Sequence, residues 1–154
     1  MGFLTGKTAI ITGAGRAVLK DGSCGSIGYG IATAYAKEGA NLVITGRNVK
    51  KLEAAKQELE SLYGIKVLTV QADVCAGGNN EATVANVVKQ AVDTFGGIQV
   101  LINNAQASAS GVPLTEHTTE QFDLAIYSGL YAAFYYMKAC YPCLLYTSPS
   151  PRDA

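Results

Sequence analysis

Short β-branched segments alternate with amphipathic helical segments along most of this chain of 154 residues. The predicted strands cover residues 8–12, 41–45, 66–70 and 98–102, and the predicted helices cover residues 26–38, 49–63, 81–95 and 118–141. Strands that are separated by helices pair in parallel, and right-handed crossovers place helices on both faces of the sheet. The chain is therefore predicted to be an α/β domain with a doubly wound parallel sheet of Rossmann type, with loops at residues 73–80 and 103–117.

The overall charge and hydropathy exclude several classes of protein. Twelve Lys and Arg residues balance twelve Asp and Glu residues, whereas a protein that binds nucleic acid through its phosphates is expected to be basic. No apolar run approaches the ~18 residues of a membrane span, and the N-terminus lacks the features of a signal peptide. We therefore expect a cytoplasmic domain with neither a nucleic-acid partner nor a membrane partner.

Neither the cysteines nor the single histidine predicts a metal site. Cys140 and Cys143 have C-x-x-C spacing, but no second pair of Cys or His residues completes a four-ligand zinc site. His117 lies in a polar stretch that is typical of the surface. We predict no metal and assign no redox role to the two cysteines.

A glycine-rich segment between the first predicted strand and the first predicted helix is the main functional feature. The glycines are Gly13, Gly15, Gly22, Gly25 and Gly28. A tight turn at this place brings backbone N–H groups and the N-terminus of the helix close to a phosphate. Glycines also permit turns that bind nothing, but their position directly after the first strand favours a nucleotide-binding site.

Arg47 follows the second predicted strand, where such sheets bind the adenosine ribose. An acidic residue here would accept a hydrogen bond from the ribose 2′-hydroxyl, whereas an arginine accommodates a 2′-phosphate. No Asp or Glu lies between Asn41 and Lys51, so we predict NADP(H) rather than NAD(H). Arg16, in the glycine-rich loop, adds positive charge near the same phosphate; a solvent-exposed arginine without a ligand is the alternative for Arg47.

Two further motifs come directly after the third and fourth predicted strands, at the sheet edge where parallel sheets bind ligands. Asp73, followed by Val74, can hold the amino group of adenine. The amides of Asn103 and Asn104, followed by Ala105, can tie neighbouring loops together. Either motif is equally compatible with ordinary turn chemistry.

Together these motifs resemble those of the short-chain dehydrogenase/reductase family over roughly residues 4–142. The run from Thr12 and Gly13 through Ser26, Ile27 and Gly28 resembles the family's T-G-x-x-x-G-x-G coenzyme motif, although residues 17–24 split it and a serine replaces its middle glycine. The Asn-Asn-Ala run resembles N-N-A-G, with a glutamine in place of the glycine. The resemblance implies that NADP contacts Gly13, Arg16, Ser26, Ile27, Gly28, Arg47, Asp73, Val74, Asn103 and Ala105.

Four segments carry a narrower resemblance, to the clostridial 12α-hydroxysteroid dehydrogenases of bile acids. They are residues 26–32, 62–68, 103–111 and 126–137. This resemblance implies an oxidoreductase that transfers a hydride between NADP(H) and a secondary alcohol or ketone of a small hydroxysteroid, in a homodimer or homotetramer. The alternatives are a 3-oxoacyl-acyl-carrier-protein reductase, an NADP-binding regulator without catalysis, and a Rossmann methyltransferase, against which Arg47 argues.

The acid/base pair of this family, a tyrosine followed four residues later by a lysine, has no counterpart among the nine tyrosines of the chain. Tyr127, Tyr131 and Tyr135 instead form a helical stripe, for which packing is the predicted role, and Gly129 stands where the family has an asparagine. We therefore predict no catalytic residue, and we expect an incomplete N-terminal portion of a longer enzyme, inactive by itself.

Residues 143–153, with the sequence CLLYTSPSPRD, show no apolar period. They are similar to an in-frame translation of a transposase adapter used in sequencing libraries. We expect a coenzyme-binding domain over residues 1–142 and a non-native tail over residues 143–154. The unfinished sheet edge and the apolar side of the last helix are expected to be exposed.

Overall fold

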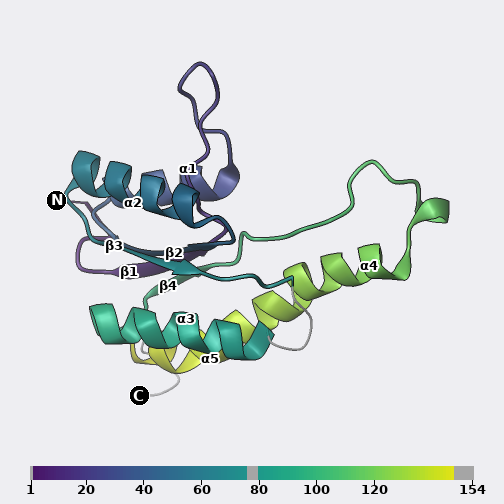
Figure 1. Ribbon diagram of the computed structural model, residues 1–154. Coiled ribbons are helices and arrows are strands. Elements are labelled where there is room, and N and C mark those ends of the chain that lie inside the picture. Colours follow the sequence, from purple (N-terminus) through teal and green to yellow (C-terminus); the bar gives the residue numbers. More distant parts are fainter. Residues whose placement is uncertain (1, 76–79, 148–154) are drawn as a thin grey trace.

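The computed structural model describes residues 2–75 and 80–147. Within them lies a parallel four-stranded sheet in the order β3-β2-β1-β4. The strands are β1 (Thr8–Thr12), β2 (Asn41–Gly46), β3 (Val67–Gln71) and β4 (Val100–Ile102). The helices α1 (Ile27–Lys37) and α2 (Val49–Tyr63) cover one face, and α3 (Asn80–Phe95) and α5 (Ala132–Thr147) cover the other (Figure 1). The predicted doubly wound α/β fold is confirmed.

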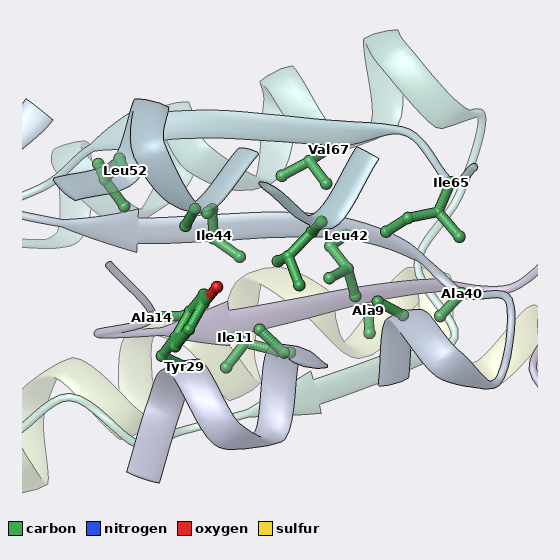
Figure 2. Packing of buried hydrophobic residues seen from close by; sticks show 14 of the residues in the cluster. Ala9, Ile11, Ala14, Tyr29, Ala40, Leu42, Ile44, Leu52, Ile65 and Val67 are labelled. Atoms are coloured by element: carbon green, nitrogen blue, oxygen red, sulfur yellow. The ribbon is translucent and has the colours of Figure 1, made fainter. Parts of the chain in front are cut away.

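The strands are buried on both faces, so each strand supplies residues to two separate apolar cores. Ile11 and Ile44 point toward α1 and α2, where they join Leu52 in the first core (Figure 2). Ile10 and Val43 point to the opposite side. The second core also contains Val84, Val87 and Ala91 of α3 and Tyr136 and Cys140 of α5.

Local signals place the ends of the first two helices. The Ser26 side chain accepts a hydrogen bond from the Tyr29 N–H at the start of α1, and Asn48 Oδ1 accepts one from the Lys51 N–H at 3.0 Å at the start of α2. Gly64 ends α2 in the left-handed region with a φ of 65°. These caps fix the N-termini of α1 and α2 at the carboxyl edge of the sheet.

The helix predicted over residues 118–141 is not a regular α-helix, which corrects the expectation. It consists of α4 (Thr119–Ala125), a π-helical segment η3 (Ile126–Tyr131) and α5, and a short 3₁₀ turn, η2 (Leu114–Glu116), precedes it. The hydroxyl of Ser128 lies 2.7 Å from the Leu124 carbonyl oxygen and accepts a hydrogen bond from the Ala107 N–H at 2.9 Å. These contacts compete with the regular helical hydrogen bonds and place the wider turn against the loop after β4.

The predicted tail is described only in part. α5 continues through Thr147 even though Pro142 lies inside it, whereas residues 148–154 lie outside the described residues, as do residues 76–79 of the loop after β3. β4 is the edge strand on one side of the sheet, and its residues are partly exposed. No helix in the described part of the chain is long and apolar enough to cross a membrane.

Candidate nucleotide-binding site

A cleft of about 210 Å³ opens at the carboxyl ends of the strands, beside the point where the strand order reverses between β1 and β4. Open α/β sheets bind their ligands at this place. Five of the predicted site residues line the cleft, namely Gly13, Arg47, Asp73, Val74 and Ala105. The other lining residues are Thr45, Gly46, Ala72, Cys75, Asn104, Gln106, Ala107 and Ser128. Sequence motifs that are far apart along the chain therefore meet at one site.

Asn104 ties the loop after β4 to the end of β1, as predicted for the side-chain amides. Its Nδ2 donates to the Thr12 carbonyl oxygen at 2.8 Å, and its backbone N–H donates to Thr12 Oγ1 at 2.9 Å. The Ala105 N–H donates to the same hydroxyl oxygen at 2.9 Å. This structural role of Thr12 was not predicted from the sequence, although its position directly before Gly13 is a recognisable signal.

Two of the predicted glycines, Gly13 and Gly28, let the glycine turn and α1 approach each other beside the Asn104–Thr12 hydrogen bonds. Gly13 adopts a φ of 71°, which favours glycine, and a Cβ there would lie 3.1 Å from Asn104 Nδ2. A Cβ on Gly28 would collide with the Gly13 carbonyl oxygen and with the Asn104 amide. Gly28 therefore lets the first turn of α1 pack directly against the glycine turn.

Ser26 and Ile27 lie at the N-terminus of α1, outside the residues that line the cleft. Ser26 caps the helix, and the exposed Ile27 is its first residue. Asn103 lines an adjoining hollow with Thr12 and Gly129. The free N–H groups and the positive end of a helix dipole attract anions. The start of α1 can therefore attract an anion next to Gly13.

Arg47 is exposed on the cleft, between the end of β2 and the cap of α2. Its backbone carbonyl accepts a hydrogen bond from Gln71 Nε2 at 3.1 Å, which fixes the chain at this point. The first turn of α2 contains no acidic residue, and Lys50 and Lys51 lie in it. The edge of the cleft that Arg47 occupies is therefore electropositive.

Asp73 and Val74 combine turn chemistry with a place in the cleft. Asp73 Oδ1 accepts a hydrogen bond from the Cys75 N–H at 2.9 Å, while Val74 is buried in the second core. Burial, and to a lesser extent the nearby Asp73 carboxylate, raise the pKa of the Cys75 thiol. The turn therefore presents a carboxylate and a protonated thiol to the cleft.

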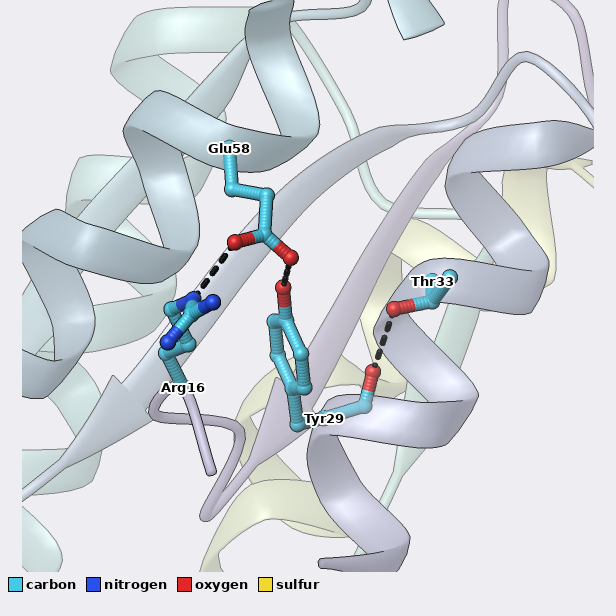
Figure 3. Close-up of polar contacts among 4 residues, drawn as sticks. All are labelled: Arg16, Tyr29, Thr33 and Glu58. Atoms are coloured by element: carbon cyan, nitrogen blue, oxygen red, sulfur yellow. Dashed lines mark hydrogen bonds and ion pairs between the residues drawn. The ribbon is translucent and has the colours of Figure 1, made fainter. Parts of the chain in front are cut away.

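Arg16 lies outside the cleft, in contact with α2 (Figure 3). Its Nε donates to Glu58 Oε2 at 2.5 Å, and the Tyr29 hydroxyl donates to the other oxygen of this carboxylate. The hydrogen bond from Tyr29 and the ion pair with Arg16 hold the pKa of the Glu58 carboxyl below its ordinary value, and burial raises the pKa of Tyr29. The sequence carries no local signal for this network, because Glu58 is far from Arg16 along the chain.

In residues 2–75 and 80–147, no three His, Cys, Asp or Glu side chains lie close enough together to hold a metal ion. The geometry offers a cleft with one electropositive edge, at Arg47, close to the glycine turn at Gly13. Such a cleft can bind a phosphorylated nucleotide.

Comparisons with known proteins identify relatives of the chain. The profile of the family described as short chain dehydrogenase matches residues 7–150. A 12alpha-hydroxysteroid dehydrogenase from Clostridium sp. is 59% identical over 97% of this chain and 55% of its own length. An uncharacterized oxidoreductase from Staphylococcus aureus is 34% identical over 94% of this chain and 55% of its own length. The chain spans about half the length of the curated relatives it matches.

Solved structures of related enzymes share the fold. An L-sorbose reductase from Gluconobacter frateurii, complexed with NADPH and L-sorbose, has a TM-score of 0.80 at 30% identity over 96% of this chain and 50% of that chain. A metagenomic short-chain oxidoreductase in complex with NADP has a TM-score of 0.79 at 27% identity over 94% of this chain and 59% of that chain. These relatives are oxidoreductases, and the predicted resemblance is confirmed: the chain belongs to the short-chain dehydrogenase family.

Proposed function

We propose that this chain forms the NADP(H)-binding part of an enzyme that transfers a hydride between the coenzyme and a secondary alcohol or ketone, with the 12α-hydroxyl group of a bile acid as the substrate position. The observation that carries the coenzyme assignment is Arg47 at the electropositive edge of the cleft. The substrate class is supported by the 59% identity to a 12alpha-hydroxysteroid dehydrogenase.

In this proposal each part of the cleft binds a different part of the coenzyme. The amides of the turn from Gly13 and the start of α1 at Ser26, Ile27 and Gly28 face the pyrophosphate. Arg47 pairs with the 2′-phosphate. Asp73 and Val74 hold the adenine, and Asn103 and Ala105 lie toward the nicotinamide half of the coenzyme. The bound coenzyme supplies the hydride chemistry.

The catalytic groups are proposed to lie outside this chain. None of its tyrosines is followed four residues later by a lysine, the pair in which the positive charge lowers the pKa of the tyrosine for acid/base work. We therefore expect no activity when the purified 154-residue chain is mixed with NADPH and a 12-oxo bile acid. The absorbance of NADPH should fall no faster than in a control without protein. Turnover would refute this part of the proposal.

Coenzyme binding tests the proposal directly. Fluorescence titration of the 154-residue chain is expected to give binding of NADPH that is tighter than that of NADH by at least ~10-fold, because a charge-assisted hydrogen bond contributes about 1.5–3 kcal/mol. Tighter binding of NADH would overturn the assignment of NADP. Binding of neither coenzyme would overturn the proposed function.

The remaining expectations stay predictions. They are the cytoplasmic location, the dimeric or tetrameric state of the whole protein and the non-native origin of residues 143–154. The nucleotide sequence that encodes residues 143–153 tests the last of them, since a match to the adapter is expected. The rates of the whole enzyme on a 12-oxo bile acid and on an acetoacetyl thioester separate the proposed substrate class from a 3-oxoacyl-acyl-carrier-protein reductase.

A further inference from the structure

Arg16 follows Gly13, which lines the cleft, by three residues, but its side chain lies outside the cleft, against α2. The Arg16 N–H donates to the Lys51 carbonyl oxygen at 2.8 Å, in the first turn of α2. The guanidinium reaches Glu58, about two helical turns further along α2 (Figure 3). Arg47 lies in the opposite direction, directly before the cap of the same helix. The Arg16 backbone is therefore bonded to α2 between Glu58, which pairs with its guanidinium, and the N-terminal end of the helix beside Arg47.

The charges along α2 explain the direction of this side chain. Arg47, Lys50 and Lys51 gather at the N-terminal end of α2, no acidic residue offsets them in the first turn, and the helix macrodipole adds positive potential. A further guanidinium is disfavoured there by repulsion between like charges. Glu58 offers a carboxylate on the same helix, so the ion pair is the favourable position for Arg16.

A phosphate monoester beside Arg47 places a local anion at the N-terminal end of α2, since it carries between one and two negative charges near neutral pH. The ion pair of Arg16 and Glu58 is a weak competitor, because their side chains are 39% and 32% exposed. A 2′-phosphate beside Arg47 therefore attracts the guanidinium away from the carboxylate.

We propose that Glu58 is a specificity-determining residue, which competes with the 2′-phosphate of NADP(H) for the guanidinium of Arg16. The inference rests on the proposed function, because it concerns the same coenzyme. Glu58 lowers the preference for NADP(H) over NAD(H) by the free energy needed to release Arg16. NAD(H) has no 2′-phosphate, so its binding does not draw on this ion pair.

Tyr29 is a positioning residue in this arrangement. It is buried in the first core, and its hydroxyl donates to the Glu58 oxygen that does not face Arg16. This hydrogen bond holds the carboxylate in the orientation that receives the guanidinium. Loss of the hydroxyl is expected to weaken the ion pair without removing the charge of Glu58.

The test is a titration of the 154-residue chain with NADPH and with NADH. Glu58→Gln keeps the shape of the side chain and removes its charge, so NADPH affinity is expected to rise about three- to fivefold, the range that exposed ion pairs permit. NADH affinity is expected to change by less than about twofold, within the same range. Tyr29→Phe is expected to shift NADPH affinity in the same direction by about twofold or less.

Two further variants test whether the rise in NADPH affinity in Glu58→Gln comes from release of Arg16 or from the loss of any negative charge. Asp93→Asn removes the same negative charge from an exposed ion pair on α3, on the other face of the sheet, and is expected to alter neither affinity. Arg16→Gln is expected to weaken NADPH binding and to abolish the gain from Glu58→Gln in the double variant. Circular dichroism confirms that each variant is folded.

The outcomes distinguish this inference from the function on which it rests. An unchanged ratio of NADPH to NADH affinity in folded Glu58→Gln, or a gain that persists in the absence of Arg16, makes the inference wrong while the proposed function stands. If the wild-type chain binds neither coenzyme, both are wrong.

Discussion

The two faces of the sheet are covered differently. On one face, α1 and α2 have capped N-termini and bury their apolar sides against β1, β2 and β3. On the other face, α5 buries Ala132, Tyr136 and Cys140 but leaves a second apolar stripe exposed to solvent. This stripe begins at Leu130 in η3 and continues along α5 with Phe134, Met137, Tyr141 and Leu145.

The difference separates a part of the fold whose helices are capped and packed from a part that exposes apolar side chains. The glycine turn, Arg47 and both capped helices form one closely packed unit at the carboxyl edge of the sheet. The segment from α4 to α5 supports this unit on one side only, and its other side exposes the apolar stripe to solvent. Substitutions in the first unit are therefore expected to affect folding and binding, whereas those on the stripe are expected to affect solubility.

The largest effect is expected for Gly28→Ala, which tests the packing of the first unit. Its Cβ collides with the Gly13 backbone and the Asn104 amide, so the free energy of unfolding is expected to fall by about 3 kcal/mol or more, and coenzyme binding with it. Urea denaturation measures the loss. Gly30→Ala, in the same helix, meets only the flexible end of the Cys24 side chain and is expected to cost less than about 1 kcal/mol. Equal losses would contradict the packing argument.

Thr12→Val is expected to destabilise the chain by about 2–3 kcal/mol. The variant keeps the shape of the side chain but removes the oxygen that accepts from the N–H groups of Asn104 and Ala105. Thermal unfolding measures the change. Thr8→Val, at the other end of β1, is the matched control, and a loss of the same size there would show that β1 is sensitive to any valine.

Arg47→Gln is expected to weaken NADPH binding about 10- to 100-fold with little effect on NADH, because the charge-assisted contact with the 2′-phosphate is lost. The ratio of the two dissociation constants is the measurement. Lys66→Gln removes the same charge just before β3, at the amino ends of the strands and away from the cleft. It is expected to leave the ratio of the two dissociation constants unchanged. A similar change in both variants would indicate a nonspecific effect of charge.

The smallest effect on stability is expected on the exposed stripe of α5. Phe134→Gln combined with Met137→Gln removes two large apolar side chains that are about half exposed, and the free energy of unfolding is expected to change by less than about 1 kcal/mol. Self-association is expected to decrease, as measured by sedimentation velocity. A loss of several kcal/mol would show that the stripe is part of the core.

Local patterns predicted the elements well where each element has its own signals. The helix over residues 49–63 has a cap, an apolar face and a terminal glycine, and the structure reproduces its bounds. The helix over residues 118–141 has only a start signal, a threonine cap at Thr118 or Thr119, and the structure places it at Thr118, which forms a capping box with Gln121. Its π-helical turn depends on Ser128 contacting Ala107 in a distant loop, which no local pattern indicates.

The candidate site divides in the same way. Order along the chain placed Gly13, Arg47 and Asp73 at the carboxyl ends of parallel strands, and these ends meet at one edge in any such sheet. The direction of the Arg16 side chain was not predictable, because a long flexible side chain near several charges takes its position from whichever partner the fold brings close.

The sequence by itself determined the alternation of strands and helices, the family and the place of the cleft, because hydrophobic period, caps and motif order are local properties of the chain. Only the tertiary structure decided that Tyr29 and Glu58 hold Arg16, that Thr12 holds the loop after β4 and that Ser128 places a π-helical turn against that loop. Each of these depends on contacts between residues far apart in the chain, and such contacts exist only once the sheet has brought its helices and loops together.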